Sequence, residues 1–385
     1  MASQSFRLTA YSARADTDPG EVLAGLGAAE PATGAFGGFR VAAAEIRSPS
    51  GEDLAARLRE AAATDLGWAW RAADGANRPL RAVVMGQGLD AAALHHLAGE
   101  IHSRGPLVTG LRVLSDTFPA VELTLAGPAA DPEALTRDLQ GPAEANAVDL
   151  AVLAPTTEAF GYRLLMMDMD STLLAVECID EIAEHAGVKE QVAAITERAM
   201  NGELDFKGSL VERVGMLASL PEGVLEEVYR ERIRTNPGAE RLLAAARGMG
   251  MRVAVVSGGF TFFTERLERD LGIDFTNANV LEVADGRLTG RVLGDIVDGA
   301  VKAATLRELR DRLGLTRDQL VAMGDGANDL AMIAEAGLGI AYHAKPRVRA
   351  QAPYNLFHSP LDGLLYLLGL TDADIEGYCR DSAAG

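Results

Sequence analysis

The sequence predicts an α/β fold in which a doubly wound parallel sheet carries an inserted helical cap, preceded by one or two ferredoxin-like α+β modules. After residue 160, apolar runs alternate with helical stretches, which is typical of parallel strands covered on both faces. A wholly helical stretch follows the first of these runs and predicts the cap. Before residue 156, strands and helices instead follow the order βαββαβ, which indicates a separate α+β region.

The 385 residues exceed what one hydrophobic core normally serves, so we expect two or three domains. The formal net charge of −19 disfavours nucleic acid and anionic membranes as partners, because such a field repels both. The start, MASQSFRLTA, lacks the pattern of a signal peptide, and no apolar run reaches about 18 residues. We therefore expect a cytoplasmic protein.

We place the main domain boundary near residue 156, in a stretch rich in Ala, Pro and Gly (127–160). Residues 77–156 are predicted to form a strand, a helix, two strands, a helix and a strand, with both helices on one face. Residues 1–76 contain a looser, degenerate version of the same order. This architecture hosts many functions, so no activity follows from it alone.

Residues 157–385 are predicted to form the parallel sheet. Its strands are expected at four apolar runs: RLLMM (163–167), MRVAVV (251–256), LVAM (320–323) and GLGIAY (337–342). The helical stretch at about 178–236 is inserted just after the first strand. It would cover the end of the sheet as a cap.

Three of these four strands end in polar motifs: DMDST (168–172), SGG (257–259) and GDGAND (324–329). Lys302 opens the helix before the third strand. Ligands of open α/β sheets bind at the carboxyl ends of the strands, so we expect these groups to converge on one crevice. Carboxylates gathered there would repel each other without a cation, and their hard oxygen atoms suit Mg²⁺.

The motifs match what phosphoryl transfer requires, namely a nucleophile, a cation, oriented donors and a proton for the leaving oxygen. Asp168 would attack phosphorus and form an acyl phosphate, because a carboxylate needs no base to activate it. Asp170 would protonate the leaving oxygen and later deprotonate the hydrolytic water. We therefore predict a phosphatase that works through an aspartyl-phosphate intermediate.

DMDSTLL (168–174), SGG (257–259), Lys302 and GDGANDLAM (324–332) resemble the four motifs of the haloacid dehalogenase superfamily of phosphatases. Within it, the stretches MDMDSTLLAVECIDEIAEHAG and AMNGELDFKGSLVERVGMLASLP resemble the phosphoserine phosphatases. That family hydrolyses O-phospho-L-serine to L-serine and phosphate, the last step of serine biosynthesis. The resemblance covers about residues 160–370.

The resemblance implies a role for each motif residue. Asp168 would be the nucleophile and Asp170 the general acid/base. Mg²⁺ would be held by Asp168, the main-chain carbonyl of Asp170 and Asp325, with Asn328 and Asp329 as nearby supports. Lys302 would act in catalysis by steadying the nucleophile and the transferring phosphate.

The resemblance also implies a set of substrate-binding residues: Glu177, Met200, Phe206, Arg213, Ser257, Gly258 and Asn328. Ser257 and the Gly258 amide would cradle the phosphate. Glu177 would meet the substrate ammonium and Arg213 its carboxylate, an arrangement that complements a free amino acid. Met200 and Phe206 would close an apolar wall over the site.

The region before residue 156 is similar in element order to the small-molecule-sensing ACT domains that are fused to amino-acid enzymes. This similarity implies a homodimer formed through that region and an amino-acid effector, while a purely structural role stays open. Three other functions also stay open: a phosphatase for another small phosphoester, a phosphotransferase to an alcohol such as homoserine, and an amino-acid sensor with a vestigial catalytic domain.

Overall fold

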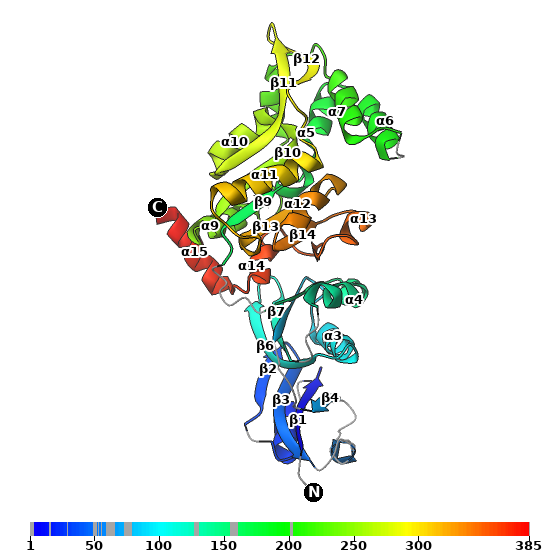
Figure 1. The fold of residues 1–385 in the computed structure, drawn as a ribbon, viewed down its shortest axis with the longest axis vertical. Coiled ribbons are helices and arrows are strands. Elements are labelled where there is room, and N and C mark those ends of the chain that lie inside the picture. Colours follow the sequence, from blue (N-terminus) through cyan, green and yellow to red (C-terminus); the bar gives the residue numbers. More distant parts are fainter. Residues whose placement is uncertain are drawn as a thin grey trace. The chain divides into compact units, whose positions relative to one another are not determined.

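The computed structural model describes residues 4–14, 17–28, 30–48, 52, 54, 56–58, 66–72, 79–126, 131–154, 161–200 and 203–384 (Figure 1). The chain forms two compact units. The first contains Met1–Ala159 together with Phe357–Ser359 and Gly363–Ile375, and the second contains the rest. The chain therefore returns to its first unit near the C-terminus, a feature that no sequence pattern indicated.

The first unit begins with an antiparallel sheet in the order β2-β3-β1-β4. Its strands are β1 (Gln4–Ser12), β2 (Ala32–Phe36), β3 (Phe39–Ser48) and β4 (Gly67–Ala72). Helix α1 (Pro19–Gly25) is capped by Asp18, whose side chain accepts from the Gly20 amide. Leu8 and Ala42 of the sheet pack with Leu23 of α1 in one apolar cluster. The alternation of strand residues thus gives one sheet face to this helix.

A second antiparallel sheet follows in the order β6-β7-β5-β8. Its elements are β5 (Leu80–Met85), α3 (Ala91–Ser103), β6 (Leu107–Ser115), β7 (Ala120–Ala126), α4 (Pro132–Ala145) and β8 (Asp149–Leu153). Their order along the chain is the predicted βαββαβ. Ala82 and Val84 share an apolar cluster with Leu97 of α3 and Leu139 of α4, so both helices cover one face of this sheet.

The opposite face of the second sheet is covered by the returning C-terminal segment. Helix α14 (Gly363–Leu367) contacts β5, where Val83 and Met85 are fully buried. Beside them, Arg81 donates to the carbonyl oxygen of Leu367. On β8, the buried Asp149 accepts from the amides of Phe357 and His358 at 2.8 and 3.0 Å. The last part of the chain thus completes the core of the first unit.

The second unit is built on a seven-stranded sheet in the order β12-β11-β10-β9-β13-β14-β15. The strands are β9 (Leu164–Met167), β10 (Arg252–Phe260), β11 (Phe275–Ala284), β12 (Arg287–Leu293), β13 (Leu320–Gly324), β14 (Leu338–Tyr342) and β15 (Tyr354–Leu356). All pairs are parallel except β11 with β12. The predicted parallel sheet is confirmed, and the four predicted strands are β9, β10, β13 and β14.

Helices cover this sheet (Figure 1). They are α9 (Ala239–Gly248), α10 (Thr261–Leu271), α11 (Gly299–Arg312), α12 (Leu330–Glu335) and α13 (Pro346–Arg349). The end of α15 (Asp372–Ala384) packs on α9, where Cys379 Sγ lies 3.8 Å from the carbonyl oxygen of Arg241. The central strand β9 is buried along its whole length. No helix in the described part of the chain has the length and apolar content needed to cross a membrane.

The inserted stretch is helical, with α5 (Cys178–His185), α6 (Lys189–Met200), α7 (Phe206–Gly215) and α8 (Gly223–Glu231). The chain enters and leaves it side by side, because Leu174 and Thr235 form an antiparallel bridge. The far end of the insertion is held as well, since the Ser219 amide donates to the carbonyl of Leu288 in β12 at 2.8 Å. The insertion is therefore attached to the sheet at two places.

Candidate active site

Asp168 lies directly after β9 and is almost completely buried. Its amide donates to the carbonyl of Met323 in β13 at 3.0 Å, which fixes the backbone between two neighbouring strands. Its Oδ1 accepts from the Met169 amide at 2.7 Å, and its Oδ2 lies 2.7 Å from Nζ of Lys302. Burial, followed by the charge of Asp329, raises the pKa of Asp168 well above its usual value, and Lys302 opposes this rise.

Lys302 is a fully buried cation on α11. Its Nζ lies 2.7 Å from Oδ2 of Asp168 and 2.7 Å from Oδ1 of Asp329. Burial alone would lower the pKa of Lys302, but the charges of these two carboxylates outweigh burial and raise it. A buried charge of this kind is stable only with such partners. Lys302 therefore stays an ammonium that fixes the carboxylates of Asp168 and Asp329.

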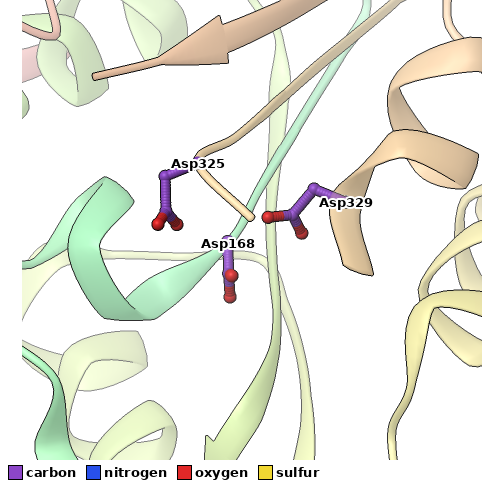
Figure 2. A group of neighbouring side chains, drawn as sticks. All are labelled: Asp168, Asp325 and Asp329. Atoms are coloured by element: carbon purple, nitrogen blue, oxygen red, sulfur yellow. The ribbon is translucent and has the colours of Figure 1, made fainter. Parts of the chain in front are cut away.

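Three carboxylates meet at this point: Asp168 after β9, Asp325 after β13, and Asp329 at the end of the short 3-10 helix Ala327–Asp329. One oxygen atom of each lies within 4.8 Å of those of the other two, and Figure 2 shows the three side chains gathered in one place. Burial and the charge of Asp329 raise the pKa of Asp325 to about 6. Three carboxylates against one lysine leave excess negative charge, which fits a hard divalent cation.

Asp329, predicted as a nearby support, is held in this cluster by two partners. Its Oδ2 accepts from the Gly326 amide at 3.0 Å, while Oδ1 binds Lys302. Asn328 lies beside it in the same turn, where a Cβ at Gly326 would lie 2.2 Å from Oδ1 of Asn328. A side chain at position 326 would therefore require the Asn328 amide group to move.

The carboxylate of Asp170 lies apart from these three, between the first residue of α5 and the SGG turn. Its Oδ1 accepts from the Cys178 amide at 3.0 Å, and its Oδ2 lies 3.5 Å from Oγ of Ser257. Burial raises the pKa of Asp170, which favours the protonated form that a general acid needs. A Cβ at Gly259 would lie 2.6 Å from Oδ2 of Asp170, so only glycine fits this close approach.

The SGG turn at the end of β10 is held by a residue that the sequence analysis missed. The Asn279 Nδ2 donates to the Gly258 carbonyl at 2.8 Å, and its Oδ1 accepts from the Val297 amide at 2.9 Å. Asn279 is buried within β11. No local signal in the sequence could have found it, because Asn277 in the same strand is also an asparagine and only burial shows that the Asn279 amide needs partners. Ser257 is fully buried, and its Oγ accepts from the Gly259 amide at 2.8 Å.

The predicted cap residues differ in how they reach the site. The Glu177 Oε1 accepts from Oγ of Ser171, in the loop that follows Asp168, at 2.8 Å. Burial and the charge of Asp170 raise the pKa of Glu177 to about 7, although its side chain keeps access to solvent, which weakens the part due to burial. Phe206, the first residue of α7, reaches the SGG turn, where a Cβ at Gly258 would lie 2.7 Å from its Cζ.

Two other cap residues are not brought into the site by the described contacts. Among these contacts, the hydrogen bond of the Arg213 side chain goes to the carbonyl of Ser209 on its own helix, at 3.4 Å. The side chain of Met200 lies outside the described residues. Both stay predictions.

Comparison with known proteins places the chain in a family. A model of haloacid dehalogenase-like hydrolases matches residues 165–334. A phosphoserine phosphatase of a Polaromonas species is 52% identical over 222 residues, which cover 56% of this chain and 94% of that protein. A phosphoserine phosphatase of Streptomyces coelicolor is 44% identical over 295 residues, covering 76% of this chain and 71% of that protein.

Solved structures agree with these relatives. The unliganded form of a probable phosphoserine phosphatase from Vibrio cholerae has a TM-score of 0.62 at 36% identity, over 77% of this chain and 88% of that one. A haloacid dehalogenase family hydrolase from Salmonella enterica has a TM-score of 0.67 at 32% identity, over 75% of this chain and 98% of that one. The chain therefore belongs to the phosphoserine phosphatases, within the haloacid dehalogenase-like hydrolases.

Proposed function

We propose that the protein hydrolyses O-phospho-L-serine to L-serine and phosphate through an aspartyl-phosphate on Asp168. The prediction of a phosphoserine phosphatase is confirmed by its relatives, which are 44 to 52% identical to it. One structural observation carries the mechanism. Asp168 is bound to a fully buried lysine at 2.7 Å beside two further carboxylates, and the Asp170 carboxylate lies two residues further along, 3.5 Å from Oγ of Ser257.

In the first step, an oxygen of Asp168 attacks phosphorus and the bond between phosphorus and the serine oxygen breaks. Asp170 gives its proton to that oxygen, which leaves as the hydroxyl of serine. In the second step, Asp170 takes a proton from water, and the resulting oxygen attacks the same phosphorus. Phosphate then leaves and Asp168 is restored as a carboxylate. The hydrogen bond from the Cys178 amide would hold the Asp170 carboxylate in position for both proton transfers.

The acidic cluster would hold Mg²⁺ through Asp168, Asp325 and the main-chain carbonyl of Asp170. Asp329 would support the site from beside it and would hold Lys302 through Oδ1. The cation, when bound, supplies positive charge that stabilises the phosphate in the transition state. Oxygen donors alone in a partly solvated crevice suit Mg²⁺ better than softer metals.

The SGG turn and the cap would select the substrate. The Ser257 hydroxyl and the Gly258 amide would receive the phosphate, with Phe206 closing the site above Gly258. Glu177 would pair with the substrate ammonium, whose charge favours the ionised form of this carboxylate. Arg213 would receive the substrate carboxylate after a change of its side-chain rotamer, and Met200 and Asn328 would complete the wall.

Phosphate release from four esters tests this function: O-phospho-L-serine, phosphothreonine, phosphoethanolamine and p-nitrophenyl phosphate, each with Mg²⁺ or with EDTA. We expect Mg²⁺-dependent preference for phosphoserine over phosphoethanolamine, which lacks the carboxylate, and no turnover in Asp168→Asn. Similar activity on all four esters would refute the assignment of O-phospho-L-serine as the preferred substrate. Release of a phosphorylated alcohol in the presence of homoserine would favour phosphotransfer.

We also propose an ACT-like role for the first unit, supported by its βαββαβ order around the second sheet. It would form a homodimer and bind an amino-acid effector. Light scattering of the whole chain, with and without added L-serine, tests the dimer, and calorimetry tests the effector. If the chain is a monomer and calorimetry shows no heat of L-serine binding, the role of this unit is structural only.

A further inference from the structure

The loop that follows Asp168 has an irregular backbone. Residues Met169–Leu173 form a single turn in which Asp170 is extended, with φ −67° and ψ 135°. The next residue, Ser171, has φ 56° and ψ −1°, in the left-handed region. This region costs a residue with a side chain about 1–2 kcal/mol. The loop that carries both catalytic aspartates therefore needs support from elsewhere in the fold.

Asn236 gives that support from the segment by which the chain leaves the cap. Its amide nitrogen donates to the carbonyl of Leu173 at 2.9 Å. Its Nδ2 donates toward the carbonyls of Ser171, Thr172 and Leu174 at 3.4, 2.8 and 3.0 Å. The four consecutive carbonyls of residues 171–174 thus face one residue. Because the side-chain amide has two N–H groups, it shares them among three acceptors.

The same exit segment holds the loop on its cap side. The Ala175 amide donates to the carbonyl of Arg234 at 2.9 Å, and Leu174 bridges Thr235. Neither Glu177 nor Asp170 bonds to Asn236, yet the loop that Asn236 holds determines where both lie. The position of the site therefore depends on contacts made by the exit segment.

We propose that Asn236 is a positioning residue, which fixes the loop bearing Asp168 and Asp170 by donating to its carbonyls. The proposal rests on the proposed phosphatase activity, because turnover is its main readout. Asn236 does not touch the reacting atoms, so its loss should leave ground-state substrate binding nearly intact. A displacement of about 1 Å between reacting groups can lower the rate about 100-fold. Removal of the Asn236 side chain should therefore lower kcat and leave KM nearly unchanged.

Two variants test the proposal. Asn236→Asp keeps the shape of the side chain but turns a carboxylate toward carbonyl oxygens, and Asn236→Ala removes the side chain. Asn355→Ala is the matched control, since Asn355 is also half-buried and its Nδ2 donates to the carbonyl of Arg349 at 3.2 Å. We expect both Asn236 variants to lose about 10-fold or more in kcat, with KM within about threefold, and the control to keep the parent kcat.

Hydrogen exchange in peptides covering residues 168–178, and the melting temperature of each variant, separate positioning from folding. Faster exchange with reduced kcat per folded molecule supports the proposal. Faster exchange with the parent kcat, or a loss of activity equal to the loss of folded protein, overturns it. Each variant is also assayed with p-nitrophenyl phosphate. If the parent prefers another ester to phosphoserine, the substrate assignment fails, while the kcat ratio on the preferred ester still decides the role of Asn236. A parent inactive on every ester refutes both.

Discussion

Replacing Lys302 by methionine should destabilise the fold strongly and in a pH-dependent way. The substitution keeps the length of the side chain but removes a fully buried ammonium that lies 2.7 Å from each of two buried carboxylates, Asp168 and Asp329. Breaking a buried ion pair on one side costs about 3–5 kcal/mol, because the remaining charge is left without compensation. Here two carboxylates lose their cation, so we expect a loss at the upper end of that range at pH 8.

The sign of the pH effect follows from the raised pKa of Asp168. A carboxyl whose pKa is higher in the folded than in the unfolded state stabilises the fold below the unfolded pKa of about 3.9, and this stability is lost as the pH rises through the folded pKa. Without Lys302, which opposes the shift, the folded pKa should rise further. When the pH is lowered from 8 to 5, the free energy of unfolding should therefore increase more for the variant than for the parent.

Urea denaturation at pH 5 and pH 8, with and without Mg²⁺, measures both effects. Mg²⁺ should restore part of the stability at pH 8, by about 2.7 kcal/mol at 100 times its dissociation constant. Lys189→Met is the control, because Lys189 is an exposed lysine paired with Glu184, and its loss should change little. A Lys302→Met protein as stable as the parent at pH 8, or with the same pH dependence, would refute the reasoning.

Three further outcomes are expected in turnover assays. Gly259→Ala should lower kcat strongly, since its Cβ would lie 2.6 Å from a carboxylate oxygen of Asp170, whereas Gly223→Ala, where a Cβ meets open space, should keep the parent kcat. The KM for phosphoserine should rise as the pH falls below about 7, because Glu177 then gains a proton and stops attracting the ammonium. A similar rise of KM in Glu177→Gln would show that another group causes this pH dependence. Lys207→Met should raise KM about two- to fivefold by breaking the ion pair to Asp298 beside Phe206, at 3.0 Å, and the difference should vanish near 1 M salt.

The parallel sheet and the position of the acidic motifs could be predicted because both depend on local patterns. Four apolar runs bounded by polar turns became β9, β10, β13 and β14. The carboxylates of Asp168 and Asp325 converge because neighbouring parallel strands end at the same edge of a sheet. Strands β11 and β12 escaped prediction, since their exposed residues interrupt the apolar pattern with polar ones.

Residues that act through long-range hydrogen bonds could not be predicted. Asn279 and Asn236 each satisfy backbone groups far away in the sequence, and an isolated asparagine has no local pattern that indicates its partners. The left-handed backbone of Ser171 was equally hidden, because serine does not mark this region as glycine does. The sequence therefore indicated which acidic groups lie together, while the groups that hold them in place required the structure.

The return of the chain to its first unit has a consequence for synthesis. Val83 and Met85 lie on the sheet face that α14 covers, and Asp149 accepts hydrogen bonds from Phe357 and His358. On the ribosome, the strands of this sheet emerge well before the segment that covers this face. An apolar surface therefore stays open while the residues between the two segments are synthesised, and chaperones can bind such a surface during that time. A chain that stops before residue 357 would keep that surface open permanently.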